Sequence, residues 1–269
     1  MPSAADLREI VDAHQWYHTL ELSPGVITRG WFDTRKLAKQ LAFPDLHGKR
    51  CLDVGTFDGY WAFEMESRGA SEVVAIDITD PAQWDWPVGS AENVRQAIGQ
   101  RKGSGDGFLI AKEALGSKVE RIECNVYDLD PDVHGMFDFV YVGSILLHLC
   151  DPVHALDRVR RVCRGDALVV DAIDMSLTIS LPWRAVALLD GKGRPWWWKP
   201  NVAGLVRMVE AAGFDVVGRP QRLAMPAGAG QPVPPLRPSV LRHPAGRNAA
   251  YIARRGDPHA AVVARPRAV

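Results

Sequence analysis

The chain has 269 residues, of which 47% are hydrophobic and 24% charged, enough for one large α/β domain with additions. Basic and acidic residues both number 32, and this zero balance gives no support for a general nucleic-acid binder. The four cysteines form no CxxC pair, which favours reduced thiols and a cytoplasmic protein. We expect no signal peptide and no membrane partner, because no apolar run approaches the roughly 20 residues of a spanning helix.

The first 46 residues are predicted to form an N-terminal helical cap. Apolar residues at Leu7, Ile10 and Val11 indicate an amphipathic helix over 3–20, with Ser3 as a candidate N-cap. A loop then leads into a short helix before the first strand of the core.

Residues 47–254 are predicted to form one domain in which strands alternate with helices. Such alternation is typical of a parallel sheet with helices on both faces, which binds ligands beyond the carboxyl ends of its strands. A helix is expected over 59–68 and another over 201–214. The core strands are expected at 50–54, 72–77, 118–124, 137–142, 166–173 and 215–218.

Two insertions interrupt the alternation, at 79–107 and 175–200, and both are expected to cover the ligand. The first has a candidate helix at 91–100. The Pro- and Gly-rich stretch 220–247 is expected to be a loop, and "NAAYIARR" a last strand. The final residues, 255–269, are predicted to be a disordered tail.

The stretch "CLDVGTFDGYWAFEMESRGASEVVAIDI" predicts a nucleotide cradle: a strand, a glycine turn, a helix and a strand ending in Asp77. Gly55 and Gly59 permit close backbone approach, and Asp77 can accept both ribose hydroxyls of an adenosine. The dinucleotide fingerprint is not met, because Phe57 replaces its middle glycine. Asp58 places a negative charge where a pyrophosphate would lie. A cationic adenosine ligand, S-adenosylmethionine (SAM), fits better than NAD, and Asp53 could face its positive end.

Over residues 29–218 the chain resembles class I SAM-dependent methyltransferases, and in particular the branch that contains the bacterial tRNA wobble-uridine carboxymethyltransferases. The likeness rests on the cradle and on "GWFDTR", "FDFVYVGSILLHLCDPVHAL" and "WWWKPNVAGLVRMVEAAGF". It departs at Phe57 and at Leu147, where the tRNA branch has a tyrosine.

The resemblance implies a Rossmann-like α/β fold with a mostly parallel seven-stranded sheet, and SAM as the cofactor. The segment that carries Arg29, Trp31 and Arg35 is expected to fold over SAM, and the end of the third strand to hold adenine. The expected cofactor residues are Trp31, Arg35, Asp53, Gly55, Thr56, Phe57, Gly59, Asp77, Ile78, Asn125, Val126 and Gly143.

Methyl transfer from a sulfonium needs alignment, exclusion of water and, for a protonated acceptor, a base; no metal is expected. His148 follows the fourth strand and is the candidate catalytic base, unless it only bonds the backbone of its own turn. Aromatic residues in the insertions are expected to cover the acceptor. The expected substrate-binding residues are Trp84, Trp86, Asp171, Trp183 and Trp197. Lys199 and Asn201 either contact the acceptor or cap a helix.

The favoured interpretation is therefore a SAM-dependent methyltransferase acting on a small molecule, with specialised metabolism as the expected setting. A second interpretation is a tRNA-modifying transferase, which would need a basic face such as Arg158, Arg160, Arg161 and Arg164. A nicotinamide-dependent oxidoreductase is a third, and a SAM-binding protein without catalysis is a fourth. The oligomeric state is left open.

Overall fold

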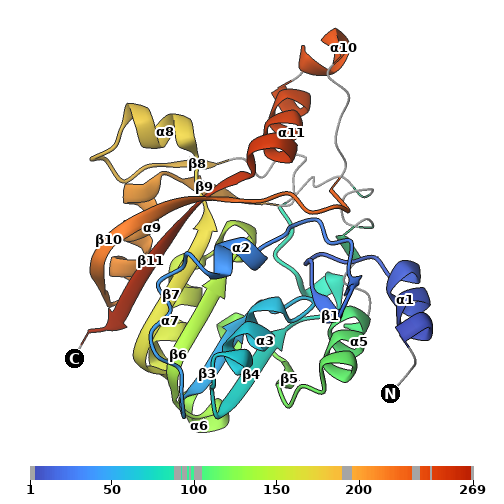
Figure 1. Ribbon diagram of the computed structural model, residues 1–269. Coiled ribbons are helices and arrows are strands. Elements are labelled where there is room, and N and C mark those ends of the chain that lie inside the picture. The colour runs from blue at the N-terminus through green and yellow to red at the C-terminus, as the bar shows by residue number, and fades with distance from the viewer. Residues whose placement is uncertain are drawn as a thin grey trace.

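The computed structural model describes residues 4–87, 92, 96, 98–99, 105–189, 196–231, 237–242 and 244–267. A seven-stranded sheet runs through its centre, with helices on both faces (Figure 1). The strand order is β10-β11-β7-β6-β3-β4-β5. The pairings from β5 across to β7 are all parallel, and β11 is antiparallel to both of its neighbours. The predicted α/β class and mostly parallel sheet are confirmed.

The strands that build the cradle lie close to their predicted positions. The sheet consists of β3 (Arg50–Val54), β4 (Glu72–Asp77), β5 (Glu120–Glu123), β6 (Phe137–Gly143), β7 (Cys163–Ala172), β10 (Phe214–Met225) and β11 (Asp257–Pro266). The small hairpins β1–β2 (Glu21–Ser23, Val26–Ile27) and β8–β9 (Ala187–Leu189, Trp198–Pro200) lie outside it.

One face of the sheet is covered by helices from the first half of the chain. They are α1 (Ala4–Ala13), α2 (Arg35–Ala38), α3 (Tyr60–Ser67) and α5 (Asp106–Leu115), whose apolar residues share a core cluster with Phe139 and Tyr141 of β6. Burial of this apolar surface fixes these helices on the sheet. The predicted helix over 3–20 is thus shorter in the structure; its proposed cap Ser3 lies outside the described residues, as does most of 91–100.

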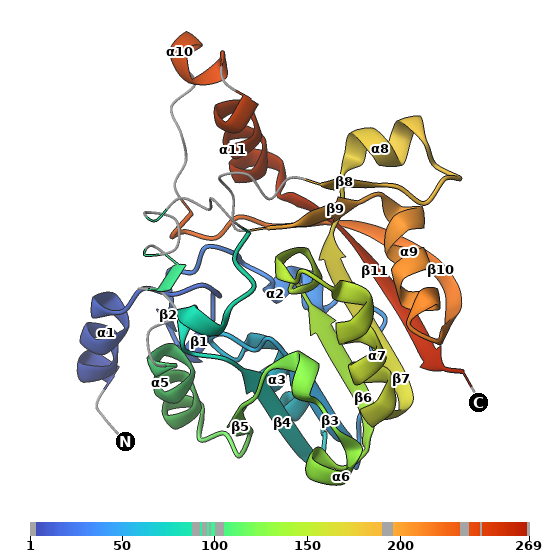
Figure 2. The same cartoon turned by 180° about the vertical axis from the view of Figure 1, so that it is seen from behind.

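The opposite face is covered by α7 (Pro152–Val162) and α9 (Val202–Ala211), which lie in front of the sheet in Figure 2. Their buried residues, such as Leu156 and Leu205, pack with Leu52 and Val140 of the sheet. Four further helices among the described residues are α6 (Pro131–His134), α8 (Met175–Ser180), α10 (Pro238–Leu241) and α11 (Pro244–Arg255).

The prediction of a disordered tail at 255–269 is wrong. Residues 257–266 form β11, which pairs with β7 on one side and β10 on the other. Ala260 and Val262 face one core cluster, and Ala261 faces the other. A strand buried on both faces is a continuous run of small apolar residues, which lacks the alternation that marks a half-exposed strand.

Two neighbouring predictions also fail. "NAAYIARR" is not a strand but part of α11, as its alanines and arginines favour. The stretch 220–247, predicted to be a loop, begins with the second half of β10 and contains α10. Both errors have one cause: the last strand of the sheet was predicted at "NAAYIARR", whereas it lies at Asp257–Pro266.

Candidate functional site

The cradle turn after β3 has the backbone geometry that the glycines suggested. Gly55 has a φ of 78°, and a Cβ there would lie 2.9 Å from Ile145 Cδ1. Phe57 takes the left-handed conformation too, with a φ of 51°, although it is not glycine. Its ring stacks on Tyr17 at a centroid distance of 4.5 Å. The bulky residue therefore holds the N-terminal segment over the turn, at the cost of backbone strain.

Asp77 lies where the resemblance places the ribose-binding acid. Its carboxylate accepts the backbone N–H groups of Phe57 (2.7 Å) and Ile78 (2.8 Å), which ties the end of β4 to the glycine turn. Gly55, Asp77 and Ile78 line two adjoining cavities. The acid is thus held in place beside the turn where an adenosine would lie.

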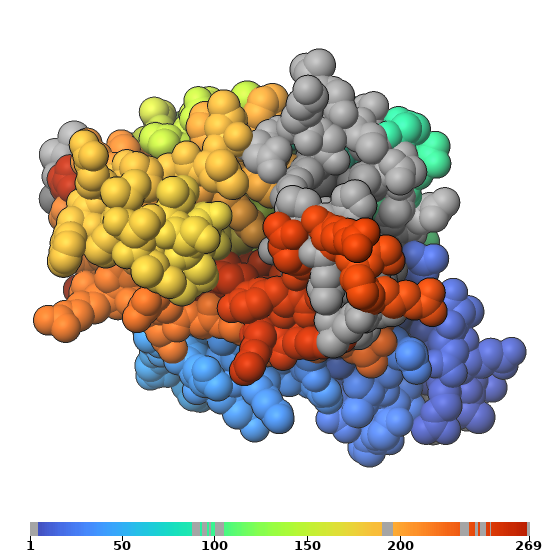
Figure 3. All heavy atoms as spheres, turned by 90° about the horizontal axis from the view of Figure 1, so that it is seen from above, coloured from blue at the N-terminus to red at the C-terminus, as the bar shows by residue number. Residues whose placement is uncertain are grey.

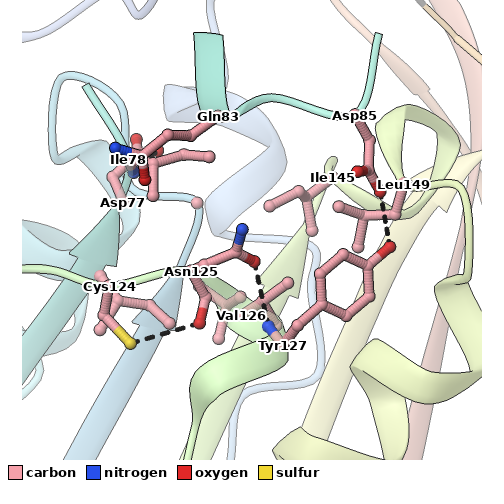
Figure 4. A pocket seen from close by; sticks show the side chains of 13 residues that line it. Asp77, Ile78, Gln83, Asp85, Cys124, Asn125, Val126, Tyr127, Ile145 and Leu149 are labelled. Atoms are coloured by element: carbon pink, nitrogen blue, oxygen red, sulfur yellow. Dashed lines mark hydrogen bonds between the residues drawn. The ribbon is translucent and has the colours of Figure 1, made fainter. Parts of the chain in front are cut away.

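The smaller cavity, of about 40 Å³, lies between the ends of β3, β4 and β5 and the segment 83–85 (Figure 4). Asn125 and Val126 line it, as predicted for an adenine site. Asp85 accepts the Tyr127 hydroxyl (2.7 Å) and the Cys150 N–H (2.8 Å), and so fixes the first insertion over this cavity. The residues fit an adenosine: an acid for the ribose, a glycine turn and an apolar slot.

The larger cavity, of about 380 Å³, opens at the same edge of the sheet. Parallel strands bring their carboxyl ends together there, and antiparallel β11 brings its amino end to the same edge. Residues from widely separated parts of the chain meet in its wall. They are Tyr17, His18, Trp31, Phe32, Thr34, Gly55, Phe57, Trp61, Asp77, Ile78, Trp84, Asp85, Trp86, Ile98, Gly143, Ser144, Ile145, Leu147, His148, Leu149, Ala172, Trp196, Lys199, Met225, Gln231, Ile252, Asp257 and His259.

Seen from above, segments far apart in the sequence share this face of the molecule (Figure 3). The N-terminal segment runs along one side and the segment around α8 along the other. Trp197 links the second insertion to the first, because its indole N–H donates a hydrogen bond to the Asp85 carbonyl oxygen (2.6 Å). Its backbone N–H donates to the Leu147 carbonyl oxygen (2.8 Å). The two insertions are thereby joined to each other and to the turn that carries His148.

The structure places part of the predicted site on the cavity walls. The residues that line one or both cavities are Trp31, Gly55, Phe57, Asp77, Ile78, Trp84, Trp86, Asn125, Val126, Gly143, His148 and Lys199. His148 ends a short turn after β6, where its backbone N–H donates to the Ile145 carbonyl oxygen (2.9 Å). Its position in the wall agrees with the predicted location, and its role as a base stays a prediction.

Four predicted cofactor residues, Arg35, Asp53, Thr56 and Gly59, are not among the described residues that line the two cavities. Their role in SAM binding stays a prediction. The Arg35 guanidinium instead donates to Asp33 (2.7 Å), and Gly59 is the left-handed N-cap of α3. Asp53 is 1% exposed, and its burial raises the pKa of the carboxyl to about 7.

Three predicted substrate-binding residues, Asp171, Trp183 and Trp197, are not among the described residues that line the cavities, and their role stays a prediction. Asp171 is buried and accepts the backbone N–H groups of Leu146 and Ala172, both at 2.8 Å, so it supports the His148 turn from below. Trp183 is 93% exposed. Trp197 joins the two insertions, and its neighbour Trp196 lines the cavity in its place. Asn201 caps α9 by accepting the Gly204 N–H (2.7 Å).

Sequence reasoning missed the contributions of both ends of the chain. Tyr17 and His18 lie in the wall, and burial lowers the pKa of His18 to about 3, so this imidazole is neutral. Asp257 and His259 lie at the start of β11. The sequence signal for them is two polar residues, Asp257 and His259, directly before an apolar run, in the segment predicted to be a tail.

Comparison with known proteins agrees with this geometry. Residues 52–170, less than half of the chain, match the family model described as "Methyltransferase domain". These residues are therefore similar to a methyltransferase domain, and the fold is shared with methyltransferases solved with the SAM product S-adenosylhomocysteine. In the described residues, no helix has both the length and the apolar character needed to cross a membrane.

The curated relatives share one description. The chain is 29% identical over 178 residues to the tRNA U34 carboxymethyltransferase of Ectopseudomonas mendocina. The matched region covers 64% of this chain and 47% of the relative. The chain is 28% identical over 189 residues to the enzyme of the same description from Pseudomonas paraeruginosa, covering 68% and 50%. The chain thus spans about half the length of the curated relatives that it matches.

Solved structures show the same fold at low sequence identity. The N-terminal domain of EvdMO1, determined in the presence of S-adenosylhomocysteine (SAH) and D-fucose, has a TM-score of 0.55 at 16% identity, covering 99% of this chain and 98% of that one. The [4+2]-cyclase SpnF has a TM-score of 0.54 at 18% identity, covering 98% and 93%. The 1,6-didemethyltoxoflavin-N1-methyltransferase of Burkholderia thailandensis has a TM-score of 0.52 at 16% identity, covering 87% and 78%.

Proposed function

We propose that this protein transfers the methyl group of SAM to a small, planar, largely apolar acceptor. The observation that carries the proposal is the larger cavity, which adjoins the proposed adenosine site and is walled by aromatic residues from both insertions, the N-terminal segment and the turn after β3. These residues are Tyr17, Trp31, Phe57, Trp84, Trp86 and Trp196. Flat aromatic walls bind planar molecules well, and they exclude water from the reacting atoms.

The residues on the adenosine side would bind SAM. Asp77 would accept the ribose hydroxyls, Asn125 and Val126 would enclose the adenine, and the turn at Gly55 would allow the backbone to approach the methionine part. SAM supplies a methyl group already activated on a positively charged sulfur. The chain's part is to align the acceptor and to remove a proton where the acceptor carries one.

A second candidate, modification of a wobble uridine in tRNA, is favoured by the description of the curated relatives. The arginines that the sequence suggested for it do not support it. Arg160 and Arg161 are paired with Asp157, and Arg164 with Asp138 at the start of β6, at the edge of the sheet opposite the cavity.

A different basic stretch does favour the second candidate. Residues 216–256 contain seven arginines and no aspartate or glutamate. All seven side chains are exposed, and α11 within this stretch supplies Ile252 to the cavity wall. The arginines are Arg219, Arg222, Arg237, Arg242, Arg247, Arg254 and Arg255. A phosphate backbone could bind such a surface. Against it, Leu147 lines the cavity where the tRNA branch has a tyrosine.

The test begins with calorimetric titration of SAM, SAH and NAD. We expect micromolar binding of the two sulfur compounds and none of NAD; the reverse result would refute a methyltransferase. Methyl transfer from labelled SAM is then assayed against small planar hydroxylated and nitrogen heterocyclic compounds. Bulk bacterial tRNA is assayed separately, both with labelled SAM and with a labelled sulfonium donor that carries a carboxymethyl group in place of the methyl.

The two candidates give different outcomes in that assay. Transfer to a small compound that is unchanged in Arg254→Glu/Arg255→Glu would support the proposal. Transfer to tRNA alone, lost in this double variant and weakened by salt, would replace it with the second candidate.

A further inference from the structure

A second polar group of residues lines the larger cavity, contributed by strands other than the one that carries Asp77. Ser144 directly follows β6, and Asp257 and His259 begin β11. The His259 Nε2 lies 2.8 Å from the Ser144 Oγ, and its Nδ1 lies 2.9 Å from the Asp257 carbonyl oxygen. The side chain of His259 is 4% exposed. The imidazole is therefore held at both nitrogens, with little freedom to turn.

These contacts determine which nitrogen carries the proton. A carbonyl oxygen can only accept, so Nδ1 must be the protonated nitrogen of the neutral ring. Nε2 then presents a lone pair, and the Ser144 hydroxyl donates to it. Another acceptor for that hydroxyl, the Val170 carbonyl oxygen, is farther away at 3.5 Å. The free lone pairs of Ser144 Oγ are thus available to accept a hydrogen bond from a bound molecule.

The groups around His259 act on its affinity for a proton in opposite directions. On its own strand, an Asp257 carboxylate oxygen lies 4.0 Å from Nδ1. From β9, the Lys199 Nζ lies 3.6 Å from the other Asp257 oxygen, and from β7 the buried Asp171 is nearby, next to the Ala172 that pairs with His259. Burial lowers the pKa of His259, Asp257 raises it and Lys199 lowers it further; the pKa is lowered on balance, so the ring is neutral at pH 7.

We propose that Ser144 binds the reacting hydroxyl of the acceptor and that His259, acting through Ser144, receives its proton. This inference rests on the proposed function and specifies its acceptor: a planar molecule with an acidic hydroxyl, that is, a phenol or a hydroxylated heteroaromatic. Ser144 lies next to Gly143, which lines the cavity as Gly55 does, and β6 and β3 are adjacent strands. The polar pair is therefore close to the turn where the methionine part would lie.

The transfer balances with these residues alone. The acceptor oxygen forms a bond to the methyl carbon while the carbon–sulfur bond breaks, and the bonding electrons stay on sulfur. The acceptor proton passes to Ser144 Oγ as the Ser144 proton passes to His259 Nε2. The products are a methyl ether, a neutral thioether and an imidazolium beside the Asp257 carboxylate, which stabilises the new charge.

The test uses the full chain with saturating SAH and 4-nitrophenol, a planar phenol whose ionised form is coloured. In ¹⁵N spectra of histidine-labelled protein, we expect His259 to have its proton on Nδ1 before the phenol is added. Binding should shift the His259 signals toward the imidazolium form and increase the ionised fraction of the bound phenol at pH 7. His259→Gln should bind the phenol without increasing that fraction.

A second variant tests Ser144 independently of His259. Ser144→Ala should weaken 4-nitrophenol binding about tenfold, as expected for the loss of one hydrogen bond, with unchanged SAH affinity. His47→Gln, at a histidine whose side chain is 80% exposed, is the matched control and should behave as wild type.

Three results would overturn the inference: an Nε2–H tautomer, equal ionised fractions in wild type and His259→Gln, or no binding of 4-nitrophenol to the SAH complex. Failure of SAH itself to bind would instead refute the proposed function.

Discussion

The Asp58 carboxylate accepts the backbone N–H groups of Tyr17 (2.6 Å) and His18 (2.9 Å), some 40 residues earlier in the chain. Asp58 is only 2% exposed and lies in the turn that leads into α3. On sequence grounds, the negative charge of Asp58 argues against a bound pyrophosphate. In the structure this carboxylate binds the backbone N–H groups of Tyr17 and His18. It fastens the N-terminal segment, with two residues of the cavity wall, to the cofactor turn.

Removal of this contact should loosen the N-terminal segment. Asp58→Ala leaves two N–H groups without an acceptor, so we expect the free energy of unfolding to fall by about 2–4 kcal/mol and SAH affinity to weaken. Denaturant titration and calorimetry measure the two effects. Asp45→Ala, at a side chain that is 81% exposed, is the control. Wild-type stability in Asp58→Ala would show that the contact contributes nothing.

Asp77→Ala should weaken SAM binding roughly 100-fold, because the ribose loses its acceptor and the Phe57 N–H loses its partner. Calorimetry with SAM measures this, with Asp132→Ala at an exposed position as the control. Unchanged affinity would mean that the cofactor lies elsewhere.

Phe57 offers a comparison between two substitutions. Both Phe57→Ala and Phe57→Gly lose the stacking on Tyr17, but alanine keeps the strain of a positive φ, which glycine relieves. Phe57→Gly should therefore be more stable than Phe57→Ala by about 1 kcal/mol. Equal unfolding midpoints and slopes in urea would contradict this account of the turn.

Asp171 should make stability fall as the pH rises. Burial raises its pKa from the usual 3.8 to about 7, so between these values the folded state holds a proton that the unfolded state has released. The stability gained from the protonated acid is complete below pH 4 and is lost as the pH approaches 7.

Asp171→Asn should therefore flatten the dependence of the unfolding free energy on pH between 4 and 7. Part of the slope should remain, because Asp53 titrates with the same sign. The exposed Asp132→Asn is the control. A wild-type slope in Asp171→Asn would show that Asp171 is ionised throughout.

His148 can be tested separately from Ser144 and His259. His148→Ala should leave SAM binding intact and reduce turnover by about 10²-fold or more if it is a general base. Full turnover in this variant, measured with the acceptor identified by the methyl-transfer assay, would leave His148 a structural residue of its turn.

In the middle of the chain, the local sequence pattern was sufficient to predict where the strands lie and which residues stand at their ends. The strands β3, β4, β6 and β7 are largely buried apolar runs, and Gly55 and Asp77 lie at the carboxyl ends of β3 and β4 at the spacing of a nucleotide cradle. Because parallel strands place such residues at one edge of the sheet, the pattern also predicted that Asp77, Asn125 and His148 lie near one another. Which of them face the cavity could not be predicted, as Asp53 and Asp171 show: both are near a strand end, and both are buried below the site.

The sequence by itself determined the fold class and the strand–turn–helix–strand unit over 50–77, because these depend on strand periodicity and on residues at fixed offsets from strand ends. Only the tertiary structure decided what encloses the acceptor. The stretch 257–266 resembles a tail until β7 and β10 bind it from both sides, and only that pairing brings His259 within 2.8 Å of Ser144, 115 residues earlier. Contacts of such sequence separation depend on the assembled sheet, and no local pattern encodes them.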